Sequence, residues 1–123
     1  MTAPPTILLA EPDEALAASL RFTLELQGHR VTLLSTADLP QACRELSGPT
    51  CLVLGERPRS TEMLDLAAYL SHASSLIAVI VLTTYPSRAT RKRAHRCGVT
   101  LIEKPLLGET LNEALRASFA AEI

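Results

Sequence analysis

Charged and hydroxyl-bearing side chains that could do chemistry are concentrated at four points of the chain, each directly after a short apolar run. The four points are Glu11-Pro12-Asp13, Gly55-Glu56, Thr83-Thr84 and Glu103-Lys104-Pro105. If the runs are parallel strands, these points meet at one edge of the sheet, where such folds place their functional crevice. Carboxylates, hydroxyl groups and a lysine ammonium would share that crevice. No glycine-rich loop follows the first run, which argues against a dinucleotide or P-loop site.

The elements that would position these groups alternate along the chain. Five apolar runs predict strands at 7–10, 31–34, 51–54, 77–82 and 100–102. Helical periodicity predicts helices at 14–27, 38–46, 61–73, 87–97 and 108–119. Strands that are apolar on both faces and alternate with helices predict a parallel sheet covered on both sides. We therefore expect one α/β domain over residues 1–123, with no linker or second domain.

Composition excludes several classes of protein. The chain is 47% hydrophobic and 20% charged, with a net charge of -1, which is typical of a folded domain and not of a chain-wide polyanion binder. No apolar run approaches a membrane span and the N-terminus lacks a basic signal region, so we expect a cytoplasmic protein with no membrane partner. Cys43, Cys51 and Cys97 lack metal-ligand spacing, and we interpret them as small core residues.

The motifs, taken in order, resemble the CheY-like receiver domain of bacterial response regulators. The resemblance covers residues 6–120 and is carried by ILLAEPDEAL at 7–16, LTT at 82–84 and GVTLIEKPL at 98–106. It implies a flavodoxin-like, doubly wound sheet of five parallel strands in the order 2-1-3-4-5, with five flanking helices.

The same resemblance implies a phosphorylation site, of which this chain keeps only a part. In the family, an aspartate after strand three accepts the phosphoryl group, two acids after strand one hold Mg²⁺, and a strand-four hydroxyl and a strand-five lysine contact the phosphoryl oxygens. Thr83 and Lys104 match this pattern, and Glu11 stands in for the first acid. The replaced positions are Pro12 for the second acid, Gly55 for the acceptor aspartate and Leu101 for the aromatic switch residue.

These replacements predict that the phosphorylation chemistry is lost. Glycine cannot form an acyl phosphate, and Glu11 alone is a poor Mg²⁺ site, so we expect no enzymatic activity, no metal and no cofactor. Glu56 could accept phosphate instead, but a shift of one residue turns its side chain away from the crevice, and we interpret it as a solvated loop acid. Lys104 could still bind an anion; the favoured interpretation is an ion pair with Glu11.

The predicted fourth helix is strongly basic. Five of the chain's 12 lysines and arginines fall within nine residues: Arg88, Arg91, Lys92, Arg93 and Arg96. This stretch could be a solvated face, a phosphate-backbone contact or a docking surface for an acidic protein, and we favour docking. In the receivers that the chain resembles, the fourth helix, the fifth strand and the fifth helix form the output and dimerisation face.

We therefore expect a pseudo-receiver that works without phosphorylation, as an adaptor or inhibitor in bacterial two-component signalling. It looks similar to FixJ-type receivers and to the small FixT-type inhibitors, so the expected partner is a sensor histidine kinase or an output regulator. A homodimer through helix four, strand five and helix five is a further option. Two alternatives remain open: a small nucleic-acid-binding regulator that uses the basic helix, and a phospho-accepting receiver that uses Glu56 with Mg²⁺.

Overall fold

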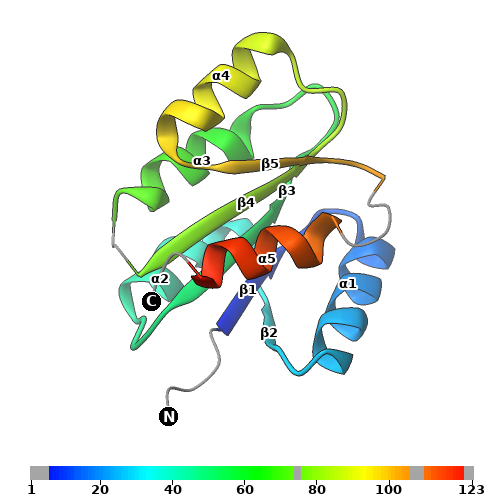
Figure 1. The fold of residues 1–123 in the computed structure, drawn as a ribbon, viewed down its shortest axis with the longest axis vertical. Coiled ribbons are helices and arrows are strands. Elements are labelled where there is room, and N and C mark those ends of the chain that lie inside the picture. The colour runs from blue at the N-terminus through cyan, green and yellow to red at the C-terminus, as the bar shows by residue number, and fades with distance from the viewer. Residues whose placement is uncertain (1–5, 74–75, 106–109, 121–123) are drawn as a thin grey trace.

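Five parallel strands form a single sheet in the order β2-β1-β3-β4-β5 (Figure 1). The structure, a computed structural model, describes residues 6–73, 76–105 and 110–120, without the side chains of 118–120. The strands are β1 (Thr6–Ala10), β2 (Arg30–Leu33), β3 (Thr50–Gly55), β4 (Ile77–Thr83) and β5 (Thr100–Glu103). The predicted fold class and strand order are confirmed.

Five helices connect and cover the strands. They are α1 (Glu14–Leu26), α2 (Leu39–Arg44), α3 (Glu62–Ser71), α4 (Arg88–Cys97) and α5 (Thr110–Ala120). A short 3₁₀ turn at Thr36–Asp38 precedes α2, which is shorter than the sequence predicts. The start predicted for the last helix falls partly on residues 106–109, which lie outside the described residues. Within the described part of the chain, none of the helices is both long and apolar enough to cross a membrane.

Local capping residues set the ends of the helices that flank the crevice. The side chain of Asp13 accepts a hydrogen bond from the amide of Leu16 at 3.1 Å, and Ser87 does the same for Thr90 at the start of α4. Gly98 ends α4 with a φ of +72°, a left-handed conformation that glycine adopts without strain. These signals lie within three residues of the ends that they mark, so the sequence alone indicates the start of α1 and both ends of α4.

The sheet separates two apolar layers. Side chains of α1 and α5 pack on one face, and those of α2, α3 and α4 pack on the other. Along β3, Cys51 and Val53 face α1 and α5, whereas Leu52 and Leu54 face α3. This alternation assigns each residue that follows a strand to one side of the molecule.

The three cysteines lie where small core residues are expected. Cys43 and Cys51 are buried, Cys97 is half-buried, and no disulfide joins any two of them. Burial raises the pKa of the Cys43 thiol, which makes its reactive thiolate scarcer at neutral pH.

Candidate functional site

The crevice lies at the carboxyl ends of β1, β2 and β3, where a cavity of about 460 Å³ opens. Its lining includes Glu11, Pro12, Gly55 and Glu56, which come from the segments after β1 and β3. Parallel register brings these ends together, because Ala10 pairs with Leu54. The strand alternation then sends neighbouring side chains in opposite directions.

Glu11 and Lys104 form an ion pair at this edge of the sheet. Lys104 Nζ lies 2.5 Å from Glu11 Oε1, and the Glu11 side chain is 0% exposed. The contact is ionic, because Oε1 is not aligned with a hydrogen-bond donor among the described residues. The other carboxylate oxygen accepts a hydrogen bond from the Asp13 amide at 3.0 Å. The ion pair predicted from the sequence is therefore present. The ammonium group of Lys104 is already engaged with an anion.

The Glu11 carboxylate lies directly over Gly55. A Cβ atom built at Gly55 would lie 2.4 Å from the Glu11 carboxyl carbon and 2.6 Å from its Oε2, distances that real side chains do not adopt. Since the carboxylate also contacts Lys104 and the Asp13 amide, moving it aside would strain or break these contacts. Glu11 thus occupies the space in which a side chain at position 55 would have to stand.

The remaining positions of the predicted site are spread around this pair. The backbone carbonyl of Thr83, a buried residue, accepts a hydrogen bond from the Lys104 amide at 2.7 Å and links β4 to the end of β5. Pro12 is exposed, and its ring offers no ligand atom. Leu101 lies away from the crevice, half-buried against the layer formed with α3 and α4.

The residues at this edge do not fit a magnesium site. Glu11 is neutralised by Lys104, and neither Pro12 nor Gly55 carries an oxygen ligand in its side chain. Throughout the described residues, no cluster of three or more His, Cys, Asp or Glu side chains could hold a metal ion.

Glu56 is buried, so the prediction of a solvated loop acid is wrong. Glu56 is only 3% exposed to solvent. Its carboxylate accepts hydrogen bonds from the amides of Met63 at 2.8 Å and Leu64 at 3.1 Å. These amides belong to the first turn of α3, where backbone N–H groups have no partner within the helix. Glu56 therefore caps α3 from seven residues away, while Thr61 at the N-cap position makes no side-chain bond there.

Two sequence signals could have located this cap. The alternation along β3 already assigns residue 56 to the α3 side of the sheet. A parallel strand followed by a helix also brings the residue after the strand close to the start of that helix. The carboxylate of Glu56 is thus committed to backbone amides, which counts against a phospho-acceptor role.

Burial raises the pKa of Glu56, and the hydrogen bonds from α3 lower it by less. The folded state then holds the proton of Glu56 more tightly than the unfolded state does. The contribution of protonated Glu56 to the free energy of unfolding is therefore complete below the ordinary glutamate pKa near 4.5, and it is lost as the pH rises through the raised pKa. We expect Glu56→Gln to remove this pH dependence, because the amide oxygen can still accept from the α3 amides. Urea unfolding of both proteins between about pH 4.5 and 8 measures it.

Glu62→Gln is the matched control for this measurement. Glu62 stands in the first turn of the same helix but is exposed to solvent. The free energy of unfolding of Glu56→Gln relative to wild type should increase with pH, and that of Glu62→Gln should not. An identical pH dependence in the two variants would contradict the assignment.

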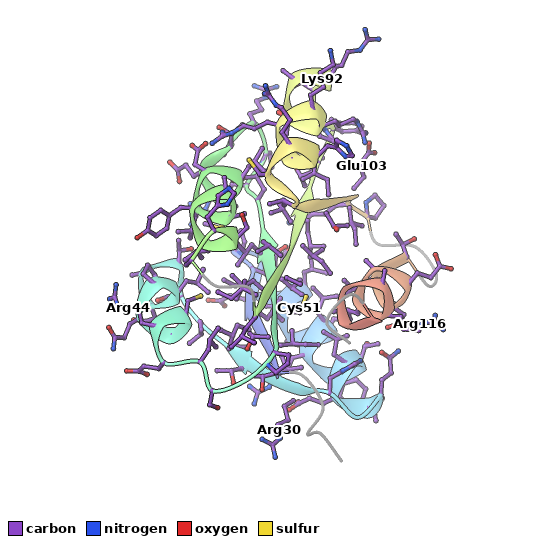
Figure 2. All side chains as sticks on the ribbon, turned by 60° about the vertical axis from the view of Figure 1, so that its left-hand side comes forward. Arg30, Arg44, Cys51, Lys92, Glu103 and Arg116 are labelled. Atoms are coloured by element: carbon purple, nitrogen blue, oxygen red, sulfur yellow. The ribbon has the colours of Figure 1, made fainter. Side chains whose placement is uncertain are left out.

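The basic side chains of α4 fall into two groups. Arg91 forms an ion pair with Glu103 of β5, and Arg93 forms one with Asp65 of α3. The cations that have no ion pair among the described residues are Arg88, Lys92 and Arg96, all exposed. Their spacing of four residues sets them along one line of the helix. Figure 2 shows Lys92 on α4, on the side away from the body of the protein.

Solved structures resemble the chain over nearly its whole length. A protein from Burkholderia pseudomallei K96243, described as pilus assembly-related, is 27% identical with a TM-score of 0.79, and the match covers 94% of this chain and 90% of that one. A CheY-like response regulator receiver domain protein from Methanospirillum hungatei JF-1 is 21% identical with a TM-score of 0.81, covering 97% and 96%. A second protein described by a role in pilus assembly, from Burkholderia thailandensis E264, is 24% identical with a TM-score of 0.79, covering 95% and 99%. No protein-family model matches the sequence, and no curated protein matches it.

Proposed function

We propose that this chain, which has the fold of the CheY-like response-regulator receiver domains, acts in two-component signalling without being phosphorylated. The observation that carries the proposal is the position of the Glu11 carboxylate, over Gly55 and against Lys104. A negative group that belongs to the chain occupies the place of the acceptor side chain in the resembled family and contacts the lysine that would otherwise face the phosphoryl group. The Lys104 ammonium contacts a carboxylate in the unmodified chain, so no phosphorylation is needed to supply an anion.

A site with a permanent anion favours a single conformation of the output face. Lys104 contacts Glu11, and the backbone bond from Lys104 to Thr83 joins the two strands next to α4. Leu101 is held by apolar contacts and has neither a ring nor a hydroxyl that would distinguish two positions. The chain would therefore act through binding alone, as an adaptor or inhibitor of a sensor histidine kinase or an output regulator. Three cysteines with no disulfide between them favour a cytoplasmic setting for this role.

The α4 face is the proposed partner surface. Its three unpaired cations would attract an acidic protein and speed the association at low salt. Tyr85, which is 90% exposed, precedes α4 and has a positive φ of 48°. Exposed tyrosine and arginine side chains are the types that most often anchor protein interfaces. Arg91 and Arg93 also remain partly exposed, but their charges are already balanced by Glu103 and Asp65.

We expect Lys92→Glu combined with Arg96→Glu to weaken partner binding at least about tenfold without affecting the fold. The change reverses two unpaired charges and leaves the ion pairs of Arg91 and Arg93 intact. The immobilised chain is used to capture proteins from a bacterial lysate, and the bound histidine kinases and response regulators are identified by mass spectrometry. The affinity of a captured kinase is then measured for wild type and variant.

Arg30→Glu combined with Arg44→Glu is the control, because it changes the net charge equally at exposed sites far from α4 (Figure 2). Equal losses in both double variants would indicate a general charge effect and would contradict a specific α4 surface. Capture of neither a kinase nor a response regulator would contradict the two-component role. Retention on DNA that the α4 variant abolishes would favour the nucleic-acid regulator instead.

A second candidate function is favoured by the 27% identity with the pilus assembly-related protein of Burkholderia pseudomallei. Under this alternative the chain is a receiver-like module that binds a component of a pilus assembly apparatus. The same capture experiment distinguishes the two functions. If the alternative holds, the wild-type chain captures pilus assembly proteins and not histidine kinases, and the α4 variant loses them.

A further inference from the structure

Helix α1 is apolar on two opposite faces. Ala17, Leu20 and Leu24 are buried against the sheet, as a helix that covers a sheet requires. A second stripe points to solvent and consists of Ala15, Ala18, Phe22 and Leu26. Phe22 is 66% exposed and Leu26 is 72% exposed. At about 100° per residue, the centre of this outer stripe lies opposite the buried one.

The outer stripe changes in size along the helix. Its first half carries two alanines, and its second half carries a phenylalanine and a leucine. Two such helices that pack in antiparallel orientation place Phe22 of one against Ala18 of the other, and Leu26 against Ala15. Each large side chain then meets a small one, which close packing of helices requires. In a parallel pair, Phe22 would meet Phe22 and the alanines would leave a gap.

We infer that α1 pairs with the α1 of a second copy of this chain in antiparallel orientation, around a two-fold axis. A two-fold interface needs a surface that is complementary to itself, and the size gradient of the outer stripe provides one. The flank of the stripe carries Arg21 and Glu25, which pair within the helix at 3.3 Å, so no uncompensated charge opposes the contact there. Antiparallel helix dipoles also attract each other.

The α4 face is a poorer surface for self-association. A two-fold contact through α4 would bring the three unpaired cations Arg88, Lys92 and Arg96 against the same three of the other copy. Like charges at such a contact weaken it, especially at low salt. The charge pattern thus separates two roles, with α4 suited to an acidic partner and α1 suited to a second copy.

Self-association is tested by sedimentation velocity of the full chain from about 1 to 500 µM. A single helix pair is at the small end of interface sizes, so we expect a weak dimer with a dissociation constant of roughly 10–100 µM. Ala18→Glu and Phe22→Lys, both at exposed positions, should each weaken the dimer at least about tenfold. Circular dichroism and thermal unfolding verify that the variants remain folded.

A mixture of the two variants tests the antiparallel orientation. In the mixed dimer, Glu at position 18 of one chain faces Lys at position 22 of the other, while the second end keeps its original Ala18–Phe22 contact. We expect the mixed dimer to be at least about tenfold tighter than the dimer of either variant alone. In a parallel pair, position 18 meets position 18 and position 22 meets position 22, so no Glu–Lys contact forms and mixing only relieves the like-charge repulsion in each variant's own dimer. The double variant Ala18→Glu with Phe22→Lys separates the two orientations, because its own dimer has two Glu–Lys contacts if antiparallel and only like-charge contacts if parallel.

Ala89→Glu is the matched control for Ala18→Glu, and Tyr69→Lys is the control for Phe22→Lys, because each replaces an exposed alanine or aromatic side chain on α4 or α3 by the same charged residue. Both should leave self-association unchanged. A chain that stays monomeric up to the highest concentration overturns the inference, as does a dimer that Ala18→Glu leaves intact. A dimer weakened by both single variants but not restored by mixing overturns the antiparallel orientation.

Discussion

Incubation of the chain with acetyl phosphate and Mg²⁺ is expected to leave its intact mass unchanged. Glycine at position 55 has no group to accept a phosphoryl, and the carboxylate of Glu56 is buried and already bonded to the amides of α3. Lys104 is paired with Glu11, and no oxygen-ligand set for Mg²⁺ is present at this edge. Intact-mass spectrometry over the time of a standard phosphorylation reaction measures the result.

Gly55→Asp alone is expected to remain unphosphorylated. Its Cβ would lie 2.4 Å from the Glu11 carboxyl carbon, so the new carboxylate would push Glu11 away from Lys104 and place two negative groups together. The comparison is a triple variant that combines Gly55→Asp with Glu11→Asp and Pro12→Asp. This variant shortens the obstructing side chain and supplies the acids that the resembled family uses, so it should gain one phosphoryl group.

A stable adduct on Glu56 of the wild-type chain would show that the site is active. Efficient phosphorylation of Gly55→Asp alone would show that Glu11 moves aside easily and does not block the position.

Lys104→Met is expected to destabilise the chain by about 3 kcal/mol. The Glu11 side chain is 0% exposed, and removing the lysine leaves its charge buried with one hydrogen bond from the Asp13 amide. Removing one partner of a buried pair costs more than the pair itself contributes, because the remaining charge has lost its solvent. Urea unfolding at neutral pH measures the difference.

The double variant Glu11→Gln with Lys104→Met should recover at least half of this loss, because no unpaired charge then remains. Lys92→Met is the control at an exposed lysine without an ion pair, and it should leave the free energy of unfolding nearly unchanged. If the single and double variants at Glu11 and Lys104 lose the same stability, the buried charge is not the cause.

The sequence predicted the features that depend on local patterns. Apolar runs placed the strands, and Asp13 marked the start of α1 because a capping side chain acts within three residues of its own position. The pairing of Glu11 with Lys104 could also be predicted, since both residues directly follow strands of one parallel sheet.

The features that the sequence did not predict depend on contacts between distant segments. Glu56 reaches over seven residues to α3, so the loop residues alone did not show its burial, although the alternation along β3 placed it on the α3 side of the sheet. Arg93 meets Asp65 across 28 residues, and only the packing of α4 beside α3 shows that this arginine is not free. The close approach of Glu11 to Gly55 could not be predicted either. It depends on the direction of the Glu11 side chain in space, and the order of residues along the chain does not show that one carboxylate fills the place of another.

The position of Glu11 over Gly55 also limits the mutational paths by which this chain could regain phosphorylation. An aspartate introduced first at position 55 meets the Glu11 carboxylate, and a shortened Glu11 introduced first gives up its reach to Lys104 while there is still no acceptor. An acid at position 12 brings no advantage until both other changes are present. None of the three substitutions brings an advantage on its own, because each leaves the phosphorylation site incomplete. The ion pair therefore makes the loss of the phosphorylation site difficult to reverse by single steps.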